Sequence, residues 1–344
     1  MGEARADSAA AKLEASNWSR ILARYRSPSA ARSFVEILIT FGPFVLLWVA
    51  TWLGVYFGYW ISLVLAVPAA GFLVRLFMIQ HDCGHGALFK ARWANDWVGR
   101  IAGVFTLTPY DYWKRTHAIH HGTHGNLDRR GLGAIELMTV AEYRELSPFR
   151  QFLYRLYRHP IVLFGIGPAY LFVIQHRIPF GEMRGGLRPW FQIMATNLAI
   201  AAVATGAILI AGVGPFLMVH LPIVLLAATI GVWLFYVQHQ FENAHWKRDG
   251  EWDLHDAALQ GSTHYDLPNP LRWLTANIGV HHVHHLNSRI PFYRMPQILK
   301  DHPPLRNVKR LTLAQSLRCV PLTLWDETAE RMVTFRQAKL AYAK

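Results

Sequence analysis

Three short histidine clusters are the residues of this chain best suited to chemistry. Residues 81–85 read His-Asp-Cys-Gly-His, residues 117–121 read His-Ala-Ile-His-His, and residues 281–285 read His-His-Val-His-His. On a helix, residues three and four positions apart share a face, so most imidazoles of each cluster can point to one place. Because imidazole binds zinc, copper, iron and nickel, the pattern predicts a metal site.

The number of histidines predicts more than one metal ion. Eight or nine nitrogen ligands exceed the four that close a structural zinc site, and two ions with positions left for water or oxygen account for them. The candidate ligands are His81 and His85, His117, His120 and His121, and His281, His284 and His285, with His239 at the end of the last apolar run as a ninth.

Other histidines near these clusters are weaker candidates. His282 lies about 100° around a helix from His281 and should face elsewhere. His124 follows the second cluster and is expected at most behind the ligands. His245, His255 or His264 is an alternative to His239 as the extra ligand.

Two long uncharged runs must position these clusters. Neither residues 37–74 nor residues 189–241 contain Asp, Glu, Lys or Arg. A membrane-spanning helix needs about 20 apolar residues, so each run predicts two spans, with turns near residues 53–60 and 212–215. The expected fold is an all-α integral membrane protein with four transmembrane helices in two hairpins and a cytosolic helical cap that holds a di-metal site.

The same runs divide the chain into five segments. Basic residues are frequent between the two runs and absent from the turns, so the positive-inside rule places both termini and the middle segment in the cytosol. Residues 97–109 and 161–178 are too short or too broken to span, and they predict interfacial or re-entrant helices. The segments are a cytosolic leader (1–33), a first hairpin (34–80), a first cap part (81–188), a second hairpin (189–239) and a second cap part with the C-terminal tail (240–344).

Composition excludes several classes of protein. With 52% hydrophobic residues gathered in long runs, the chain is neither a soluble globular enzyme nor a disordered protein, and its 2 cysteines form no disulfide framework. The net charge of +13 does not require nucleic acid, because basic residues beside a membrane can contact anionic head groups. No apolar segment precedes Phe34, so no cleavable signal peptide is expected.

The clusters resemble those of a known family. The segments H-D-C-G-H, R-T-H-A-I-H-H and N-I-G-V-H-H-V-H-H are similar to the three histidine boxes of the integral membrane fatty acid desaturases. G-N-L-D-R-R-G and F-Y-V-Q-H-Q-F-E look most like the acyl-lipid branch of the Δ12 and Δ5 kind. Three residues separate the histidines of the first box, as in that branch, whereas the stearoyl-CoA branch has four. This spacing argues against acyl-CoA as the substrate.

The resemblance implies an activity and its cofactors. It implies that the eight box histidines and His239 hold two iron ions, which use O2 to introduce a cis double bond into a lipid-linked fatty acyl chain. The chain has no C-x-x-C pair and no G-x-G-x-x-G unit, so the electrons come from a separate donor, ferredoxin or cytochrome b5. We expect ferredoxin and a multi-pass protein of the bacterial inner (cytoplasmic) membrane.

Alternatives remain open for the reaction and for supporting residues. Hydroxylases and epoxygenases share the boxes, whereas a metal transporter is less favoured because the clusters lie outside the middle of the spans. Four acids are candidates for holding ligand N–H groups, although each is equally plausible as an ordinary surface or loop acid: Asp82, Asp128, Glu242 and Asp266. Four aromatic residues are candidates for lining an apolar substrate tunnel, although each is also a plain core candidate: Phe105, Tyr110, Trp113 and Trp233.

Overall fold

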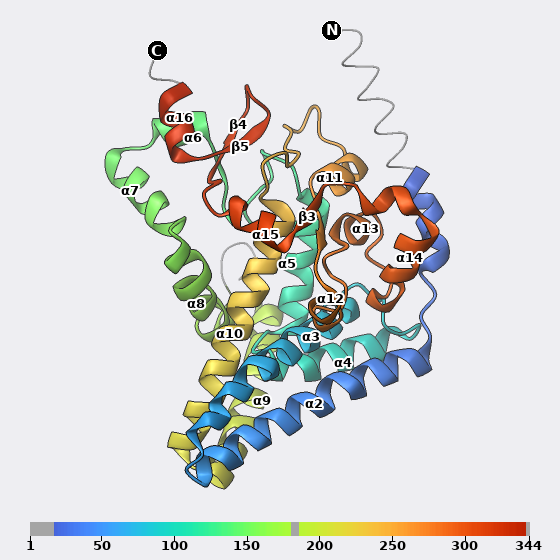
Figure 1. Ribbon diagram of the computed structural model, residues 1–344, viewed down its shortest axis with the longest axis vertical. Coiled ribbons are helices and arrows are strands. Elements are labelled where there is room, and N and C mark those ends of the chain that lie inside the picture. The colour runs from blue at the N-terminus through green and yellow to red at the C-terminus, as the bar shows by residue number, and fades with distance from the viewer. Residues whose placement is uncertain (1–16, 180–185, 342–344) are drawn as a thin grey trace.

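The computed structural model describes residues 17–179 and 186–341, so the first part of the predicted leader lies outside the described residues. Within them, 4 helical segments are long and apolar enough to cross a membrane, as predicted. They lie together at one end of the molecule, below a cap of shorter elements (Figure 1). The spans are α2 (Ala30–Tyr56), α3 (Ala66–Gly84) with the 3-10 turn η2 (Trp60–Leu65) before it, α9 (Leu187–Ala211) and α10 (Val213–His239).

Both breaks between consecutive spans fall inside the predicted turns. Residues 57–59 separate α2 from η2, and Gly212 alone separates α9 from α10. Gly212 has a φ of +81°. Glycine reaches this left-handed region without steric cost because it has no Cβ, so the chain can reverse in one residue.

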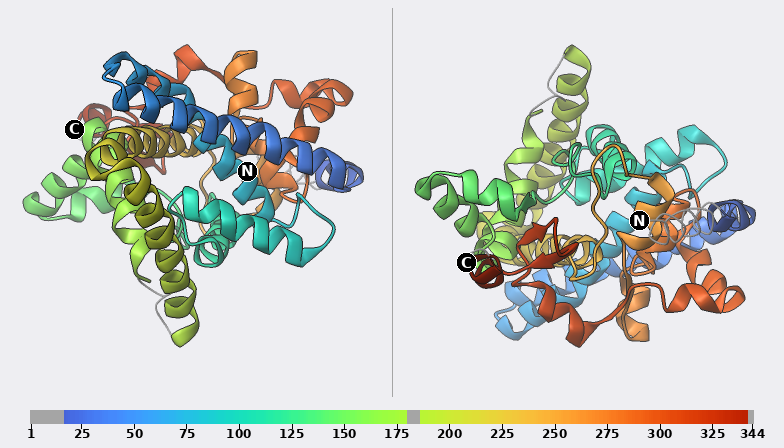
Figure 2. Two further views of the ribbon diagram at one scale, coloured as in Figure 1. Left: turned by 90° about the horizontal axis from the view of Figure 1, so that it is seen from below. Right: turned by 90° about the horizontal axis from the view of Figure 1, so that it is seen from above.

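The α3 helix lies at the centre of the bundle. It packs against α2, α10 and α4 (Arg92–Phe105), while α9 contacts α10 and α4. From below, α10 runs beside α2 and α3, and α9 extends away from α2 (Figure 2). The α3 helix ends in the first histidine cluster and α10 ends at His239. These two spans therefore lie side by side.

A bent helical pair follows the second histidine cluster. The α7 helix (Pro148–Tyr157) and residues Val162–Arg177 meet at 58° and together are apolar enough for a broken span or a re-entrant loop. The second part begins with a π-helical turn, η3 (Val162–Ile166), and continues as α8 (Gly167–Val173) and the 3-10 turn η4 (Gln175–Arg177). The interfacial placement of this segment and of α4 stays a prediction.

The cap contains short helices and, in addition, strands that the sequence analysis did not predict. Apart from α4, α7 and α8, its longest helix is α5 (Tyr110–Thr123). The other helices are α6 (Val140–Glu145), α11 (Leu254–Gln260), α12 (Asn269–Leu274), α13 (His281–Leu286), α14 (Met295–Asp301), α15 (Leu313–Ser316) and α16 (Phe335–Ala341). The strands are β1 (Met138–Thr139), β2 (His264–Asp266), β3 (Arg310–Thr312), β4 (Leu324–Asp326) and β5 (Arg331–Val333).

The strands join segments that lie far apart in the chain. β1 pairs in parallel with β4, β4 pairs antiparallel with β5, and β2 pairs in parallel with β3. The capping box of Thr139 and Glu142 begins α6 directly after β1, because each side chain bonds the other residue's backbone N–H. The C-terminal part of the chain is thereby tied to the segment that follows the second histidine cluster.

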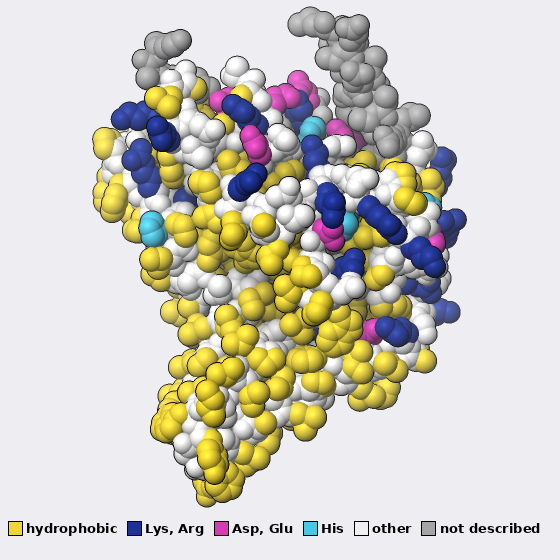
Figure 3. Space-filling model, viewed as in Figure 1, with side chains coloured by type: hydrophobic (Ala, Val, Ile, Leu, Met, Phe, Trp, Pro, Cys, Tyr) yellow, Lys and Arg dark blue, Asp and Glu magenta, His cyan; other side chains and the backbone are white. Residues whose placement is uncertain are grey.

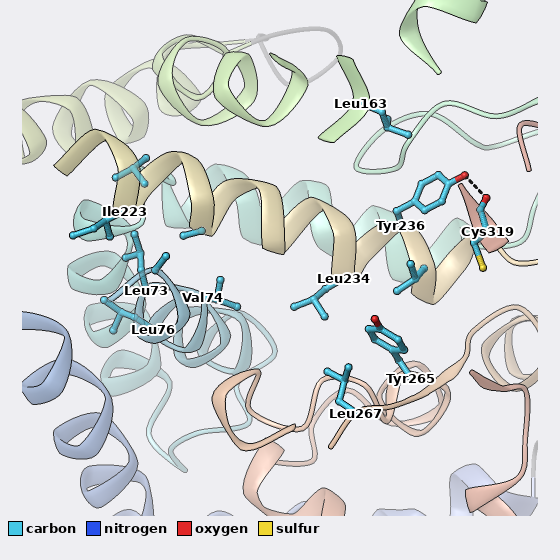
Figure 4. Packing of buried hydrophobic residues seen from close by; sticks show 14 of the residues in the cluster. Leu73, Val74, Leu76, Leu163, Ile223, Leu234, Tyr236, Tyr265, Leu267 and Cys319 are labelled. Atoms are coloured by element: carbon cyan, nitrogen blue, oxygen red, sulfur yellow. Dashed lines mark hydrogen bonds between the residues drawn. The ribbon is translucent and has the colours of Figure 1, made fainter. Parts of the chain in front are cut away.

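One buried cluster joins the spans to the cap. Leu73 and Val74 of α3 lie near Ile223 of α10, and Leu234 further along α10 lies toward Tyr265 of the cap (Figure 4). Tyr236 of α10 donates a hydrogen bond of 2.9 Å to the backbone carbonyl of Cys319. The end of α10 is therefore held by both apolar packing and a buried hydrogen bond.

A buried ion pair links α2 to α3. Arg75 and Glu36 are each 1% exposed, and their side chains form a salt bridge. The Arg75 Nε atom donates to Thr40 at 3.1 Å, and its guanidinium lies 4.1 Å from the ring of Trp273 in α12. These two charges flank the uncharged run of residues 37–74, and Arg75 also contacts α12.

The surface divides in the same way as the fold. Hydrophobic side chains cover the lower part of the molecule, around the ends of the spans, while Lys, Arg, Asp and Glu gather on the cap (Figure 3). This distribution agrees with spans that lie in lipid and a cap that lies in water.

Candidate metal centre

Four parts of the fold bring the histidine clusters together at the boundary between bundle and cap. α3 ends one residue before His85, α10 ends at His239, and α5 and α13 carry the second and third clusters. α5 contacts α3, and α3 packs against α10. The histidines thus come from the cap-facing ends of two spans and from two helices of the cap.

Five histidines form a first group. One nitrogen of each lies within 4.8 Å of one nitrogen of every other. The Nε2 atom of His121 lies 3.2 Å from that of His117 and 3.1 Å from that of His284. The members are His81, His85, His117, His121 and His284.

A second group lies beside the first. It contains His120, His239 and His285, again with one nitrogen of each within 4.8 Å of the others. The Nε2 atom of His281 lies 2.9 Å from that of His239 and 3.1 Å from that of His285, so this fourth ring faces the same place. His121 of the first group stacks on His285 of the second with ring centroids 4.1 Å apart.

These short contacts between nitrogens are not satisfied by hydrogen bonds alone. An imidazole nitrogen has one in-plane position, which carries either a proton or a lone pair, so it bonds a single partner. The Nε2 atom of His239 nevertheless lies 3.1 Å from that of His120 and 2.9 Å from that of His281. Lone pairs that converge in this way fit a cation between them, and the residues present therefore suit a metal ion in each group.

Burial keeps several of these rings neutral. Removal from water, followed by repulsion from neighbouring histidines, holds the pKa of His117, His120 and His285 well below the usual value. A neutral imidazole keeps the lone pair that a metal ion needs, so the site is prepared to bind metal near neutral pH.

The neighbouring histidines lie elsewhere. His282 faces away from both groups, as expected, and its Nε2 atom is 2.9 Å from the carbonyl of Leu305. His124 packs its ring 4.1 Å from that of His239 but bonds the carbonyl of Gly261. His245, the alternative to His239, lies 3.4 Å from Asp256.

Of the four candidate acids, Asp82 contacts a ligand candidate. Its Oδ1 atom lies 3.4 Å from Nδ1 of His81, and its Oδ2 atom accepts a hydrogen bond of 2.7 Å from the backbone N–H of Phe292. Asp82 is 2% exposed. The carboxylate therefore holds His81 against the segment that follows the third cluster.

The other three acids form ion pairs with arginines instead. Within the described residues, none of the three forms an ion pair with a histidine of either group. A guanidinium forms a stronger charge-assisted hydrogen bond with a carboxylate than a neutral imidazole does, and in each case the guanidinium comes from a distant segment. Asp128 pairs with Arg248 at 2.7 Å, Glu242 with Arg331 at 3.8 Å, and Asp266 with Arg310 at 2.6 Å.

The four aromatic candidates are divided between different places. Trp113 stacks on His117 with ring centroids 4.5 Å apart, so it fixes a histidine of the first group. Tyr110 is buried and donates to the carbonyl of Cys83. Trp233 packs on Phe164. Of the four, only Phe105 lines the apolar cavity between the spans.

This cavity of about 200 Å³ lies between α2, α4, α9 and α10. Its other walls were not predicted from the sequence, although two alanines three residues apart on α9, Ala204 and Ala207, form a narrow face there. The residue after Phe105, Thr106, donates a hydrogen bond of 2.6 Å to Gln80, which directly precedes His81. The end of α4 therefore touches both the cavity and the segment that carries the first group.

Together, the apolar spans and the paired histidine groups define a membrane protein with a site that can hold metal ions at the cap end of its bundle. The profile of the fatty acid desaturase family matches residues 58–311. The chain is 43% identical to a fatty acid desaturase of Bacillus subtilis over 92% of its own length and 90% of that protein. It therefore belongs to the fatty acid desaturase family.

More distant relatives carry more detailed names. The chain is 26% identical to an sn-1 oleoyl-lipid 12-desaturase of Synechocystis over 77% of its length and 74% of that protein. It is also 26% identical to an sn-1 acyl-lipid omega-3 desaturase (ferredoxin) of the same organism over 67% of its length and 64% of that protein. Membership of the fatty acid desaturase family makes this chain an oxidoreductase.

Proposed function

We propose that this protein is an O2-dependent desaturase that introduces a cis double bond into a lipid-linked fatty acyl chain. The observation that carries the proposal is the convergence of the Nε2 atoms of His239, His120 and His281 beside a second group of five histidines. Family membership supplies the reaction class, and acyl-lipid desaturases among its relatives favour a lipid-linked substrate.

Nine histidines would hold the two metal ions. The first ion would bind His81, His85, His117, His121 and His284, and the second would bind His120, His239, His281 and His285. Asp82 would orient His81 through its Nδ1 atom, and Trp113 would fix the ring of His117 by stacking. Since these contacts fix the two rings, the protein can hold them in place for the metal ion.

Iron suits this reaction, whereas zinc has no redox chemistry. Bound iron would supply the activation of O2 that removal of hydrogen from unactivated methylenes requires. The reaction converts –CH2–CH2–, O2, two electrons and two protons into –CH=CH– and two molecules of water. The protein contributes the position of the acyl chain, because a shift by one carbon would move the double bond.

The apolar cavity between α2, α4, α9 and α10 is the proposed place of part of the acyl chain. Its walls include Phe44, Phe105, Val203 and Phe216, which are apolar and suit methylene groups. The contact of Thr106 with Gln80 supports a path from this cavity toward His81.

The electrons would come from a separate protein that docks on the cap. We favour ferredoxin over cytochrome b5, because two relatives are named sn-1 acyl-lipid omega-3 desaturase (ferredoxin). The net charge of +13 would attract an acidic donor of this kind. The chain would lie in a bacterial inner (cytoplasmic) membrane with its cap and both termini in the cytosol, since basic residues gather on the cap side.

The test is expression in a host that lacks polyunsaturated lipids, followed by mass spectrometry that locates new double bonds or hydroxyl groups. A new cis double bond is expected, and it should disappear in His120→Ala but persist in His159→Ala, whose side chain is exposed. A hydroxylated or epoxidised product would instead favour the related oxygenases of the same superfamily. No modified lipid from a protein that has inserted and bound metal would contradict the proposal.

Metal analysis gives an independent test. The purified protein should contain two ions per chain, one for each histidine group. Removal of the metal with a chelator should abolish activity, and Fe2+ should restore it while Zn2+ should not. Full occupancy by a single ion would contradict the two-ion site.

A further inference from the structure

A polar cleft of about 610 Å³ lies on the cap, separate from both histidine groups. Its walls come from α12, from the segment around the 3-10 turn η7 (Pro303–Arg306) and from the strand pair β2–β3. His282, the member of the third cluster that faces away from the metal centre, lies behind the cleft, because its Nε2 atom contacts Leu305 and its ring lies 5.8 Å from that of His264. None of the nine proposed metal ligands lines this cleft.

The cleft carries an excess of positive charge. Three arginines line it, Arg272, Arg306 and Arg310, against one acid, Asp266. Asp266 accepts from both Nε and Nη2 of Arg310, at 2.9 and 2.6 Å, and thereby neutralises one of the three. The pairing of β2 with β3 fixes the positions of His264 and Arg310, which lie directly opposite each other.

Two of the guanidinium groups keep their charge available. Arg272 bonds the side-chain oxygen of Asn269, and Arg306 donates from Nε to the carbonyl of Leu299 at 2.7 Å. Both partners are neutral, and among the described residues neither arginine forms a salt bridge. Arginine pairs with phosphate through two parallel hydrogen bonds, so two such groups in one cleft suit a phosphate ligand.

A buried histidine at the cleft lacks one partner. His264 is 3% exposed and lines the cleft. Its Nδ1 atom lies 2.6 Å from the carbonyl of Arg306 and must donate to it, because a carbonyl oxygen only accepts. The Nε2 atom of the neutral ring is then an acceptor, and no described residue donates to it. A hydroxyl group of a ligand would supply the missing donor to this Nε2 atom.

The cleft also lies where the cap meets the membrane bundle. The Leu274 side chain of α12 packs on Gly71 of α3, and the guanidinium of Arg75 lies over Trp273. On the same short helix, Leu271 and Trp273 are 39% and 41% exposed beside Arg272. Exposed apolar side chains next to a basic one are typical of a helix at the head-group level of a bilayer. Figure 3 shows basic side chains on this face of the cap, above the hydrophobic surface.

We propose that this cleft binds a phosphoglycerol group, with the phosphate on Arg272 and Arg306 and a glycerol hydroxyl on His264. The group can belong to the head of an anionic membrane lipid or to a free glycerol phosphate. The position of α12 favours the lipid. This site is independent of the desaturase reaction, so its failure would leave the proposed function intact.

The test uses the full-length metal-loaded protein in an uncharged maltoside detergent. Its affinity is measured for a short-chain phosphatidylglycerol, for the matching phosphatidylcholine, which has no free hydroxyl, and for glycerol 3-phosphate. We expect phosphatidylglycerol to bind more tightly than phosphatidylcholine. The double variant Arg272→Gln/Arg306→Gln should weaken the binding of phosphatidylglycerol at least about tenfold, which is the loss expected for removing charge-assisted contacts to phosphate.

Matched variants make the result decisive. Arg318→Gln removes an exposed arginine outside the cleft and should leave the affinity unchanged. Asn307→Asp keeps every arginine but adds a negative charge to the exposed rim of the cleft, so it should weaken binding even if the double variant folds poorly. His264→Ala should reduce the preference for phosphatidylglycerol over phosphatidylcholine.

Each outcome bears on the proposal. Binding of the lipid but not of glycerol 3-phosphate would assign the cleft to the membrane head group, and equal binding of both would assign it to the free compound as well. Equal affinities in the wild type and in Asn307→Asp, or no binding of any of the three ligands to the wild type, would overturn it.

Discussion

The Nε2 atom of His239, at the end of the fourth span, lies 2.9 Å from the Nε2 atom of His281, at the start of α13. The Nε2 atom of His239 also lies 3.1 Å from that of His120 in α5. One ring nitrogen cannot form hydrogen bonds with two others at once, so this contact indicates a position for a cation. It connects a transmembrane helix directly to both cap helices that carry histidine clusters.

Replacement of His239 should therefore be far more damaging than replacement of His245. We expect His239→Ala to lose at least half of the bound metal and to reduce desaturation at least about 100-fold, the upper end of the cost of changes that only touch a ligand. His245→Ala should retain both, because that ring contacts Asp256 and not the histidine groups. Metal analysis and lipid mass spectrometry on the two variants measure these effects, and the reverse ranking would exclude His239 from the metal centre.

Asp82 should tune the metal centre through His81. Asp82→Asn keeps the size of the side chain and an oxygen for the N–H of Phe292 but removes the negative charge beside Nδ1 of His81. We expect metal affinity or activity to fall about 10- to 100-fold. Glu242→Gln is the control, because Glu242 is 62% exposed and faces Arg331. Competition with a metal chelator gives the affinities, and equal values for the two variants would remove Asp82 from this role.

The cavity between the spans should determine which acyl chains are accepted. Ala204→Phe would fill part of it, and we expect the product from the preferred chain to fall at least about tenfold, with shorter chains relatively favoured. Ala202→Phe places the same ring on an exposed position of the same helix outside the cavity. This variant should change neither the amount of product nor the preferred chain length. The chain-length distribution of the products, determined by mass spectrometry, distinguishes the two. An unchanged distribution in Ala204→Phe would show that the chain lies elsewhere.

The ion pair of Arg75 and Glu36 should contribute to stability rather than to the reaction. Glu36→Gln leaves a buried guanidinium without its counter-charge and should lower the free energy of unfolding by about 3–5 kcal/mol. Glu330→Gln disrupts a pair in which the acid is 62% exposed, so a change of about 1 kcal/mol or less is expected. Thermal or denaturant unfolding in detergent, followed by tryptophan fluorescence, measures both. A Glu36→Gln variant as stable as the wild type would show that this ion pair does not contribute to stability.

Much of the architecture follows from local sequence patterns. The uncharged runs predict the spans and the positions of their turns because lipid imposes a requirement on every residue of a crossing helix. Spacing along a helix likewise predicts that His117, His120 and His121 share a face. It does not predict that His120 joins one group while His117 and His121 join the other. That division depends on how α5 lies against α3, α10 and α13.

The features that the sequence does not predict depend on pairing between segments far apart in the chain. Asp128, Glu242 and Asp266 are candidates from the sequence for holding ligand N–H groups, yet each forms an ion pair with an arginine from a distant segment. The strands escape prediction for the same reason, since two- or three-residue segments such as Met138–Thr139 exist only through a partner such as β4. The charges that end the first uncharged run are visible in the sequence, but their pairing across two helices is not.

Both histidine groups draw on α13, which follows every span in the chain, as well as on residues that precede the last span. During biosynthesis, the first two spans would therefore enter the bilayer with His81 and His85 still lacking their companions. Neither group can be complete until the ribosome has passed residue 285. Metal loading must accordingly be a late step, and chains shortened before α13 should leave the ribosome unable to retain either ion.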